Sequence, residues 1–296
     1  MDAIVAYEPR ARRFALPGRG GEMAALEYGP QDRPIDIVFC HANGFNARTY
    51  RTILSPLAAE LRLLAVDMRG HGDSTLPAET EGRLGWSDFR DDLVALLEQL
   101  DQAPVVLSGH SMGGATCLLA EAEVPQRVKR LVLFDPVILP PDQVRQAGSD
   151  EIRHSPMVQG ALRRRAVFED RAQALAAYRG RGAFKTWSEA QLADYVAGGF
   201  KDRPDGQVEL ACSPQWEASN FASHGHDPWA AFHQGRAPIR ILRAAEASTC
   251  RIEGHEDVLA ATGRVTLETV PQSSHFLPME RPDLVRDALL AAAQAR

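Results

Sequence analysis

The sequence predicts an α/β protein with a doubly wound, mostly parallel β-sheet and an inserted helical cap. Short, continuous apolar runs alternate with helical stretches in the first and last parts of the chain, as is typical of strands that helices cover on both faces. Between residues 140 and 232 these runs give way to arginine-rich helical segments. We therefore expect a core formed by residues 1–139 and 233–296, and a cap, or lid, formed by residues 140–232.

The first part of the chain supplies most of the expected sheet. Two apolar runs around the turn-rich GRGG predict an opening β-hairpin. Helical spacing is clear after residue 87, where Phe89, Leu93 and Leu96 recur every three or four positions. The expected elements are, in order, a hairpin of 14–17 and 23–28, strand 36–43, helix 47–60, strand 61–68, helix 87–102, strand 104–109 and strand 128–137.

The same strand pattern returns after the cap. Pro140 and Pro141 mark the entry to the cap, and its arginines at 163–165 are expected on a solvated helix face. Strands are then predicted at 238–244 and 265–271, and helix 281–295 closes the chain. The sheet therefore resumes after the insertion.

Composition excludes several classes of protein. The formal net charge is −6, with 33 basic and 39 acidic residues, so no basic field favours nucleic acid or an anionic membrane as a partner. The start of the chain lacks the pattern of a secretory signal, and no run of apolar residues has membrane-spanning length, so we expect a cytoplasmic protein. The four separated cysteines are expected to be reduced, buried thiols.

We expect neither a metal nor a cofactor. The HGHD segment at 224–227 brings two histidines and an aspartate together, but no further ligand cluster supports a metal site. A solvated cap loop is the simpler interpretation of this segment.

Ser111 is the candidate nucleophile. It lies in VVLSGHSMGGAT, between a predicted strand and a predicted helix, with Gly109 and Gly113 two residues away on either side. Glycines at these positions permit a sharp turn that exposes the serine Oγ above the sheet.

His275 is the candidate base, because it lies in SSHFLP directly after the last predicted strand. The carboxyl ends of parallel strands share one edge of a sheet, so His275 and Ser111 can meet there. HANGF at 41–45 follows another strand at that edge, and we assign the N–H groups of Asn43 and Met112 as an oxyanion hole. We expect His41 to be a structural hydrogen-bonding residue.

These segments resemble the α/β-hydrolase family, in its branch of serine esterases and lipases. HANGF resembles the oxyanion loop of the family, DMRGHGDS (67–74) its D-x-R-G-x-G-x-S loop, GHSMGG its nucleophile elbow, and SSHFLPMERPDLV its closing histidine segment. The resemblance runs from about Phe14 to Ala292 apart from the cap. Ala42 stands where the family commonly has glycine.

The acid that would orient His275 has two candidates. The family commonly carries it after the penultimate strand, where this chain has Ala247, with Glu246 beside it. Asp135 ends the strand that follows the nucleophile helix, where haloalkane dehalogenases and certain lipases carry their acid. We favour Asp135 and keep Glu246 as the alternative, because a strand end holds a carboxylate more rigidly than a loop does.

The expected activity is hydrolysis of a carboxylic ester with a small to medium acyl group, through an acyl-enzyme intermediate. A serine nucleophile argues against the dehalogenase and epoxide-hydrolase branches, which use aspartate. Lactone, thioester or C–C bond hydrolysis on the same triad remains an alternative, as does a ligand-binding or receptor module without turnover. Trp187, Tyr195 and Trp216 are expected to form part of an apolar wall over Ser111. The sequence does not predict the oligomeric state.

Overall fold

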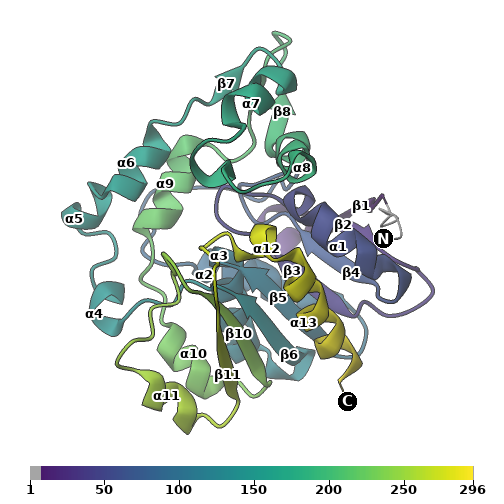
Figure 1. Ribbon diagram of the computed structural model, residues 1–296, viewed down its shortest axis with the longest axis vertical. Helices are drawn as coiled ribbons and strands as arrows, with labels where there is room; N and C mark the ends of the chain where they lie inside the picture. Colours follow the sequence, from purple (N-terminus) through teal and green to yellow (C-terminus); the bar gives the residue numbers. More distant parts are fainter. Residues whose placement is uncertain (1–7, 296) are drawn as a thin grey trace.

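An eight-stranded sheet forms the centre of the molecule (Figure 1), and the computed structural model describes residues 8–295. Its strand order is β1-β2-β4-β3-β5-β6-β10-β11. The β1–β2 and β2–β4 pairs are antiparallel and the other pairs are parallel. The strands are β1 (Arg10–Leu16), β2 (Gly21–Tyr28), β3 (Ile37–Cys40), β4 (Leu63–Val66), β5 (Val105–His110), β6 (Val128–Phe134), β10 (Ile239–Ala244) and β11 (Val265–Val270). The predicted fold class is confirmed.

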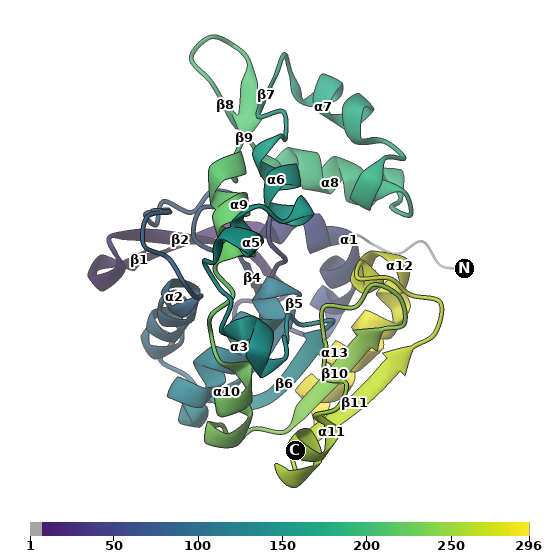
Figure 2. The same cartoon turned by 90° about the vertical axis from the view of Figure 1, so that its left-hand side faces the viewer.

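Helices cover both faces of this sheet (Figure 2). One apolar cluster joins the sheet to α2 (Ser87–Gln99), α3 (Met112–Glu123), α10 (Pro228–Gln234) and α11 (Glu256–Ala261). A second cluster joins the opposite face to α1 (Arg51–Leu54), α12 (Leu277–Glu280) and α13 (Pro282–Gln294). Strands covered in this way are apolar throughout, and all residues of β3, β4 and β5 are buried.

The helix predicted over 47–60 is broken into three pieces. A 3-10 turn at Ala47–Tyr50 leads into α1, and a second 3-10 turn follows at Ser55–Ala59. Pro56 explains the break, because proline lacks the N–H that would continue the i→i−4 ladder and its ring crowds the preceding turn.

The segment between β6 and β10 contains more than helices, and most of it lies above the sheet in Figure 1. Its helices are α4 (Pro141–Val144), α5 (Asp150–Arg153), α6 (Pro156–Leu162), α7 (Arg171–Tyr178), α8 (Glu189–Gly199) and α9 (Pro214–Ala222). A small antiparallel sheet of β7 (Val167–Phe168), β9 (Val208–Leu210) and β8 (Phe200–Asp202) joins them. Helix α10 begins at Pro228, and its Trp229 and Phe232 belong to the same apolar cluster as residues of α3.

None of the helices within residues 8–295 has the length and apolar character needed to cross a membrane. Cys40, Cys117, Cys212 and Cys250 are buried free thiols, as predicted.

Candidate active site

Ser111 lies in a sharp turn between β5 and α3. Its backbone has φ 57° and ψ −120°, a region that a non-glycine residue rarely adopts. The two flanking glycines are required by close approach, because a Cβ on Gly109 would lie 2.5 Å from the Gly113 carbon, and one on Gly113 would lie 2.3 Å from the Cys40 oxygen. The turn is held by hydrogen bonds from Ser111 N–H to Phe134 O and from Val137 N–H to Ser111 O.

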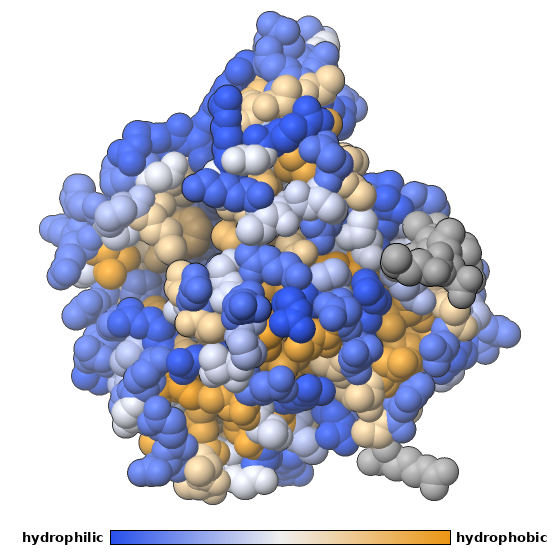
Figure 3. Space-filling view, in the orientation of Figure 1, coloured by the Kyte–Doolittle hydropathy of each residue, from blue (hydrophilic) through white to orange (hydrophobic). Residues whose placement is uncertain are grey.

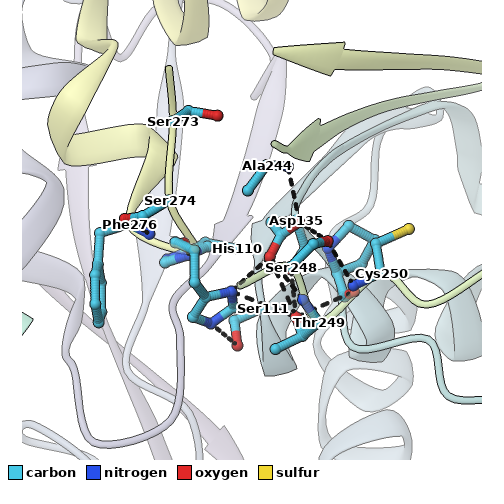
Figure 4. A network of polar contacts seen from close by, with 12 residues as sticks. His110, Ser111, Asp135, Ala244, Ser248, Thr249, Cys250, Ser273, Ser274 and Phe276 are labelled. Carbon is cyan, nitrogen blue, oxygen red and sulfur yellow. Dashed lines mark hydrogen bonds and ion pairs between the residues drawn. The ribbon is translucent and has the colours of Figure 1, made fainter. Parts of the chain in front are cut away.

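The structure brings Ser111, His275 and Asp135 into one hydrogen-bonded series. Figure 4 shows Ser111 and Asp135 close together within a network of polar contacts. His275 Nε2 lies 3.0 Å from Ser111 Oγ, and His275 Nδ1 lies 2.6 Å from Asp135 Oδ2. Since the carboxylate can only accept, Nδ1 carries the proton and Nε2 is left to accept from the serine hydroxyl. This is the tautomer that a general base needs.

The carboxylate of Asp135 is buried and surrounded by donors from the segment after β10. Its Oδ1 accepts from Ala244 N–H at 2.9 Å and from Ser248 Oγ at 2.5 Å, and its Oδ2 accepts from Thr249 N–H at 3.0 Å. Burial alone would raise the pKa of Asp135, but the hydrogen bonds from His275, Ser248 and Ala244 lower it below its ordinary value. The group is therefore held as a carboxylate.

Glu246, the alternative acid, does not reach the histidine. The residue is exposed, and its backbone N–H donates to Ser273 O at 3.0 Å. Ala247 follows in a left-handed conformation with φ 50°, and the chain then turns Ser248 and Thr249 toward Asp135. The loop that carries the alternative acid Glu246 thus donates hydrogen bonds to the carboxylate of Asp135.

The predicted oxyanion loop lies beside the nucleophile turn. The N–H groups of Ala42, Gly44 and Phe45 donate to Tyr50 Oη, His71 Nε2 and Ala42 O. By contrast, the backbone N–H groups of Asn43 and Met112 donate to no group in the described part of the chain. His41 is fully buried and accepts from Met68 N–H through Nε2, which makes it a structural residue, as expected.

Sequence reasoning missed a buried hydrogen-bonded series behind the triad. Ala42 N–H donates to Tyr50 Oη, Tyr50 Oη–H donates to His110 Nδ1 at 2.7 Å, and His110 Nε2–H donates to His275 O at 2.7 Å. Burial and the neighbouring His275 together lower the pKa of His110 to about 3, so the ring stays neutral. His110 stands next to the nucleophile in GHSMGG, which was the one available signal.

The three predicted aromatic residues lie in different surroundings. The centroid of the Trp187 ring lies 5.2 Å from that of Phe45 and 6.4 Å from that of Phe276, the residue that follows His275 in the sequence. Tyr195 also packs on Phe45, at 5.8 Å, but it is 2% exposed and its hydroxyl accepts from Arg164.

Trp216 is buried between α9 and α2. It is 1% exposed, its Nε1–H donates to Arg69 O at 2.9 Å, and its ring packs against Phe89 of α2. It fills the space between cap and core.

Two polar segments of the cap also differ from expectation. Arg163 and Arg165 are exposed, as predicted, but Arg164 is half-buried, pairs with Glu217 and donates to Tyr195 Oη at 2.8 Å. In HGHD, both histidines are buried, and His226 stacks on Trp86 with ring centroids 4.2 Å apart. Within the described residues, no group of three or more histidines, cysteines or carboxylates is arranged to hold a metal ion.

Comparison with known proteins identifies the family. The profile of the alpha/beta hydrolase family matches residues 37–288 of the chain. This match covers well over half of the 296 residues, and the chain therefore belongs to that family.

Individual relatives match this chain either over a short stretch or at low sequence identity. The dihydrolipoyllysine-residue acetyltransferase component of the acetoin cleaving system of Pseudomonas putida is 35% identical over 123 residues, which are 42% of this chain and only 29% of that protein. The sn-1-specific diacylglycerol lipase ABHD11 of Mus musculus is 24% identical over 262 residues, which are 86% of this chain and 79% of the lipase. The crystal structure of E-2-(acetamidomethylene)succinate hydrolase superposes with a TM-score of 0.74 at 20% identity, covering 97% of this chain and 100% of that one, and supports the fold.

Proposed function

We propose that this protein is a serine hydrolase that cleaves a carboxylic ester through an acyl-enzyme intermediate. Membership of the alpha/beta hydrolase family supports a hydrolase activity. The observation that carries the finer proposal is the pair of distances at His275, 3.0 Å to Ser111 Oγ and 2.6 Å to Asp135 Oδ2. These lie within the reach that proton transfer requires.

In the first half of the proposed reaction, Ser111 Oγ attacks the ester carbonyl carbon while His275 Nε2 takes the hydroxyl proton. The carbonyl oxygen becomes an oxyanion, which the N–H groups of Asn43 and Met112 would bind. Asp135 stabilises the imidazolium without taking its proton. When the tetrahedral intermediate collapses, the C–O bond to the alcohol breaks and His275 returns its proton to the leaving alkoxide.

In the second half, water replaces the alcohol. His275 Nε2 takes a proton from water, the resulting hydroxide attacks the acyl carbon, and collapse releases the carboxylic acid and restores the Ser111 hydroxyl. The cycle needs no cofactor, because the Ser111 proton leaves on the alcohol and a proton from water restores the Ser111 hydroxyl.

The surroundings of the triad support a small to medium apolar acyl group. The ring of Phe276 lies 5.7 Å from that of His275. The rings of Phe45 and Trp187 pack on each other and on Phe276, and Ser111 is only 6% exposed. Figure 3 shows a hollow lined by apolar residues beside α9, on the face where the cap meets the core. An apolar acyl chain would gain free energy by leaving water in such surroundings.

Replacement of the nucleophile tests the proposal. Ser111→Ala should lower hydrolysis of p-nitrophenyl esters by several powers of ten, because the triad acts as a unit, and should abolish labelling by a fluorophosphonate. Ser108→Ala, three residues earlier in β5, removes a hydroxyl that donates to Val132 O and serves as the matched control. Unchanged turnover in Ser111→Ala would exclude the assignment, and a wild-type protein that neither labels nor turns over would favour a binding module.

The substrate class needs a separate comparison. Esters of increasing acyl length, run beside thioesters and lactones, should show the highest kcat/KM on an ester. A thioester or lactone that exceeds every ester by tenfold would transfer the proposal to that class.

A further inference from the structure

The side chain of Asn43 is held by the cap. Its Nδ2–H donates to the backbone oxygen of Glu217 at 3.0 Å, and its Oδ1 accepts from Asn220 Nδ2 at 2.8 Å. Glu217 and Asn220 both belong to α9, 174 and 177 residues along the chain from Asn43. A residue of the predicted oxyanion loop is thus fixed by a helix of the inserted segment.

The orientation of Asn220 is itself determined by its partners. Asn220 is fully buried, and its Oδ1 accepts from Arg83 Nη1 at 2.7 Å, while Trp86 Nε1 donates to its backbone oxygen. Since a guanidinium can only donate, the Asn220 oxygen must face Arg83 and its NH₂ must face Asn43. Arg83 is in turn held by two hydrogen bonds to Asp88, at 2.8 and 3.1 Å.

The backbone on either side of the Asn43 N–H is also constrained. Gly44 has φ 73°, its N–H donates to His71 Nε2, and a Cβ there would lie 2.8 Å from Glu217 Oε1. Helix α9 therefore lies directly on the loop. Within residues 8–295 the Asn43 N–H has no protein acceptor, so its direction is set by these neighbouring contacts.

We infer that Asn220 is a positioning residue that orients the Asn43 N–H toward the oxyanion. This inference rests on the proposed function. Asn220 touches neither the substrate nor the triad and acts through the Asn43 side chain, which it fixes relative to the cap. The cap would then contribute to transition-state stabilisation as well as covering the site.

A misaligned N–H weakens the transition state more than the bound substrate, because the negative charge on oxygen develops only in the transition state. Loss of one whole oxyanion donor lowers kcat by about 10²–10³. Loss of its alignment should lower kcat by a smaller factor, about tenfold to a hundredfold, with KM changed less than about twofold.

The test compares Asn220→Ala with Ser219→Ala. Ser219 is the neighbouring residue of α9, and its Oγ also accepts from Arg83 Nη1, at 2.9 Å, but within residues 8–295 it makes no hydrogen bond to Asn43. We expect Asn220→Ala to lower kcat on the best ester by tenfold or more, and Ser219→Ala to leave kcat and KM within twofold of wild type.

A conservative variant separates positioning from a merely structural role. Asn220→Asp keeps the acceptor for Arg83 but cannot donate to Asn43 Oδ1. It should therefore lose as much kcat as Asn220→Ala. If Asn220→Asp restores wild-type kcat, Asn220 serves only Arg83 and the inference is overturned.

A double-mutant cycle with Asn43→Ala gives a further check, since that variant keeps the backbone N–H. In the Asn43→Ala background, Asn220→Ala should lower kcat less than twofold, because the two side chains act through one contact. Additive losses would contradict the inference. Should Asn220→Ala not fold, Asn43→Ala breaks the same Asn220–Asn43 hydrogen bond from the core side and must lower kcat by tenfold or more.

The proposed function fails in a different way. It fails when Ser111→Ala retains turnover, or when wild-type protein is neither active nor labelled. The positioning inference fails when wild type is active and labelled, yet Asn220→Ala or Asn220→Asp matches it in kcat.

Discussion

Two residues of the candidate triad have backbone conformations that favour glycine. Ser111 has φ 57° and Asp135 has φ 40°, and each lies at the end of a central strand. Such conformations cost on the order of 1–3 kcal/mol each and persist only where neighbouring contacts determine them. Hydrogen bonds from Ser111 N–H to Phe134 O and from Asp135 N–H to Leu242 O supply those contacts. These backbone conformations direct both side chains toward His275.

The first prediction concerns Asp135. Asp135→Asn should lower kcat by about three to four powers of ten near neutral pH, because the amide favours the wrong imidazole tautomer and leaves the imidazolium without a counter-charge. The sequence alone suggests that folding would be little affected. The structure shows that the same carboxylate accepts from Ala244, Ser248 and Thr249, so the melting temperature should fall as well.

Two controls separate these effects. Glu246→Gln should change kcat less than about tenfold, a barrier change below about 1.4 kcal/mol, because Glu246 is exposed and lies away from His275. Ser248→Ala removes one donor to Asp135 and should lower stability more than turnover. A severe loss in Glu246→Gln beside near-normal Asp135→Asn would reverse the assignment.

A second prediction contrasts two tryptophans of the cap. Trp187 stands beside Phe45 and Phe276, so Trp187→Ala should shift acyl chain-length preference while the melting temperature changes little. Trp216 is 1% exposed between cap and core, so Trp216→Ala should destabilise the protein by about 3–5 kcal/mol and affect all esters alike. Chain-length profiles and melting curves of both variants check this, and identical behaviour of the two would contradict it.

At the scale of elements, the strands of the main sheet could be predicted from the sequence, whereas the break in one helix and the short strands of the cap were not predicted. A mostly apolar run such as 61–68 is typical of a strand that is buried on both faces, so the strand can be predicted from the sequence pattern alone. The break in helix 47–60 could have been inferred from Pro56. The cap strands β7, β8 and β9 have only two or three residues each, too few for any alternation to show.

A third prediction concerns the buried ion pair that joins α3 to the start of β11. Glu121 is fully buried, and its carboxylate accepts from Arg264 and from the Ala237 N–H, while Arg264 also donates to Phe232 O. Arg264→Met should cost about 3–5 kcal/mol of unfolding free energy, since it leaves a buried carboxylate without its cation. Denaturant titration measures this, and kcat per folded molecule should be unchanged.

The matched comparison is an exposed pair in the same region. Arg240 of β10 and Glu268 of β11 are 41% and 49% exposed in their side chains, so Arg240→Ala should cost at most about 1 kcal/mol. If Arg264→Met and Arg240→Ala lower the free energy of unfolding equally, burial does not determine how much an ion pair contributes to stability.

At the scale of the whole molecule, local motifs predicted where Ser111, His275 and Asp135 would meet, because parallel strands bring their carboxyl ends to one edge. The supporting contacts could not be predicted in this way. Tyr50 reaches His110 across 60 residues, and Asn220 reaches Asn43 across 177. Neither residue belongs to a motif, and each acquires its role only when the cap or a neighbouring helix packs against the sheet.

The burial of four histidines is a second feature of the whole molecule that the sequence pattern did not indicate. Burial lowers the pKa of His71 to about 4, of His110 and His226 to about 3, and of His41 well below its ordinary value. Each is neutral in the folded state and becomes protonated below about pH 6.5 once the chain unfolds. Burial raises the pKa of Asp67 to about 6, which acts in the opposite direction.

The last prediction follows from the sign of these shifts. Between about pH 4 and 6.5 the unfolded chain binds protons on four histidines that the folded chain does not bind, so the free energy of unfolding should rise with pH across this window. Asp67 offsets part of the effect, because the folded state keeps its proton up to about pH 6 whereas the unfolded state loses it near 3.9. Burial also raises the pKa of Asp88 and Asp194. Four histidines still outnumber these three carboxyls, so unfolding at pH 5.5 should take up protons. Denaturant titrations at a series of pH values measure the uptake from the slope. His226→Phe keeps a ring stacked on Trp86 and should reduce the slope by about one proton, whatever its effect on stability at pH 7. A slope that His226→Phe leaves unchanged would mean that His226 is charged in the folded protein.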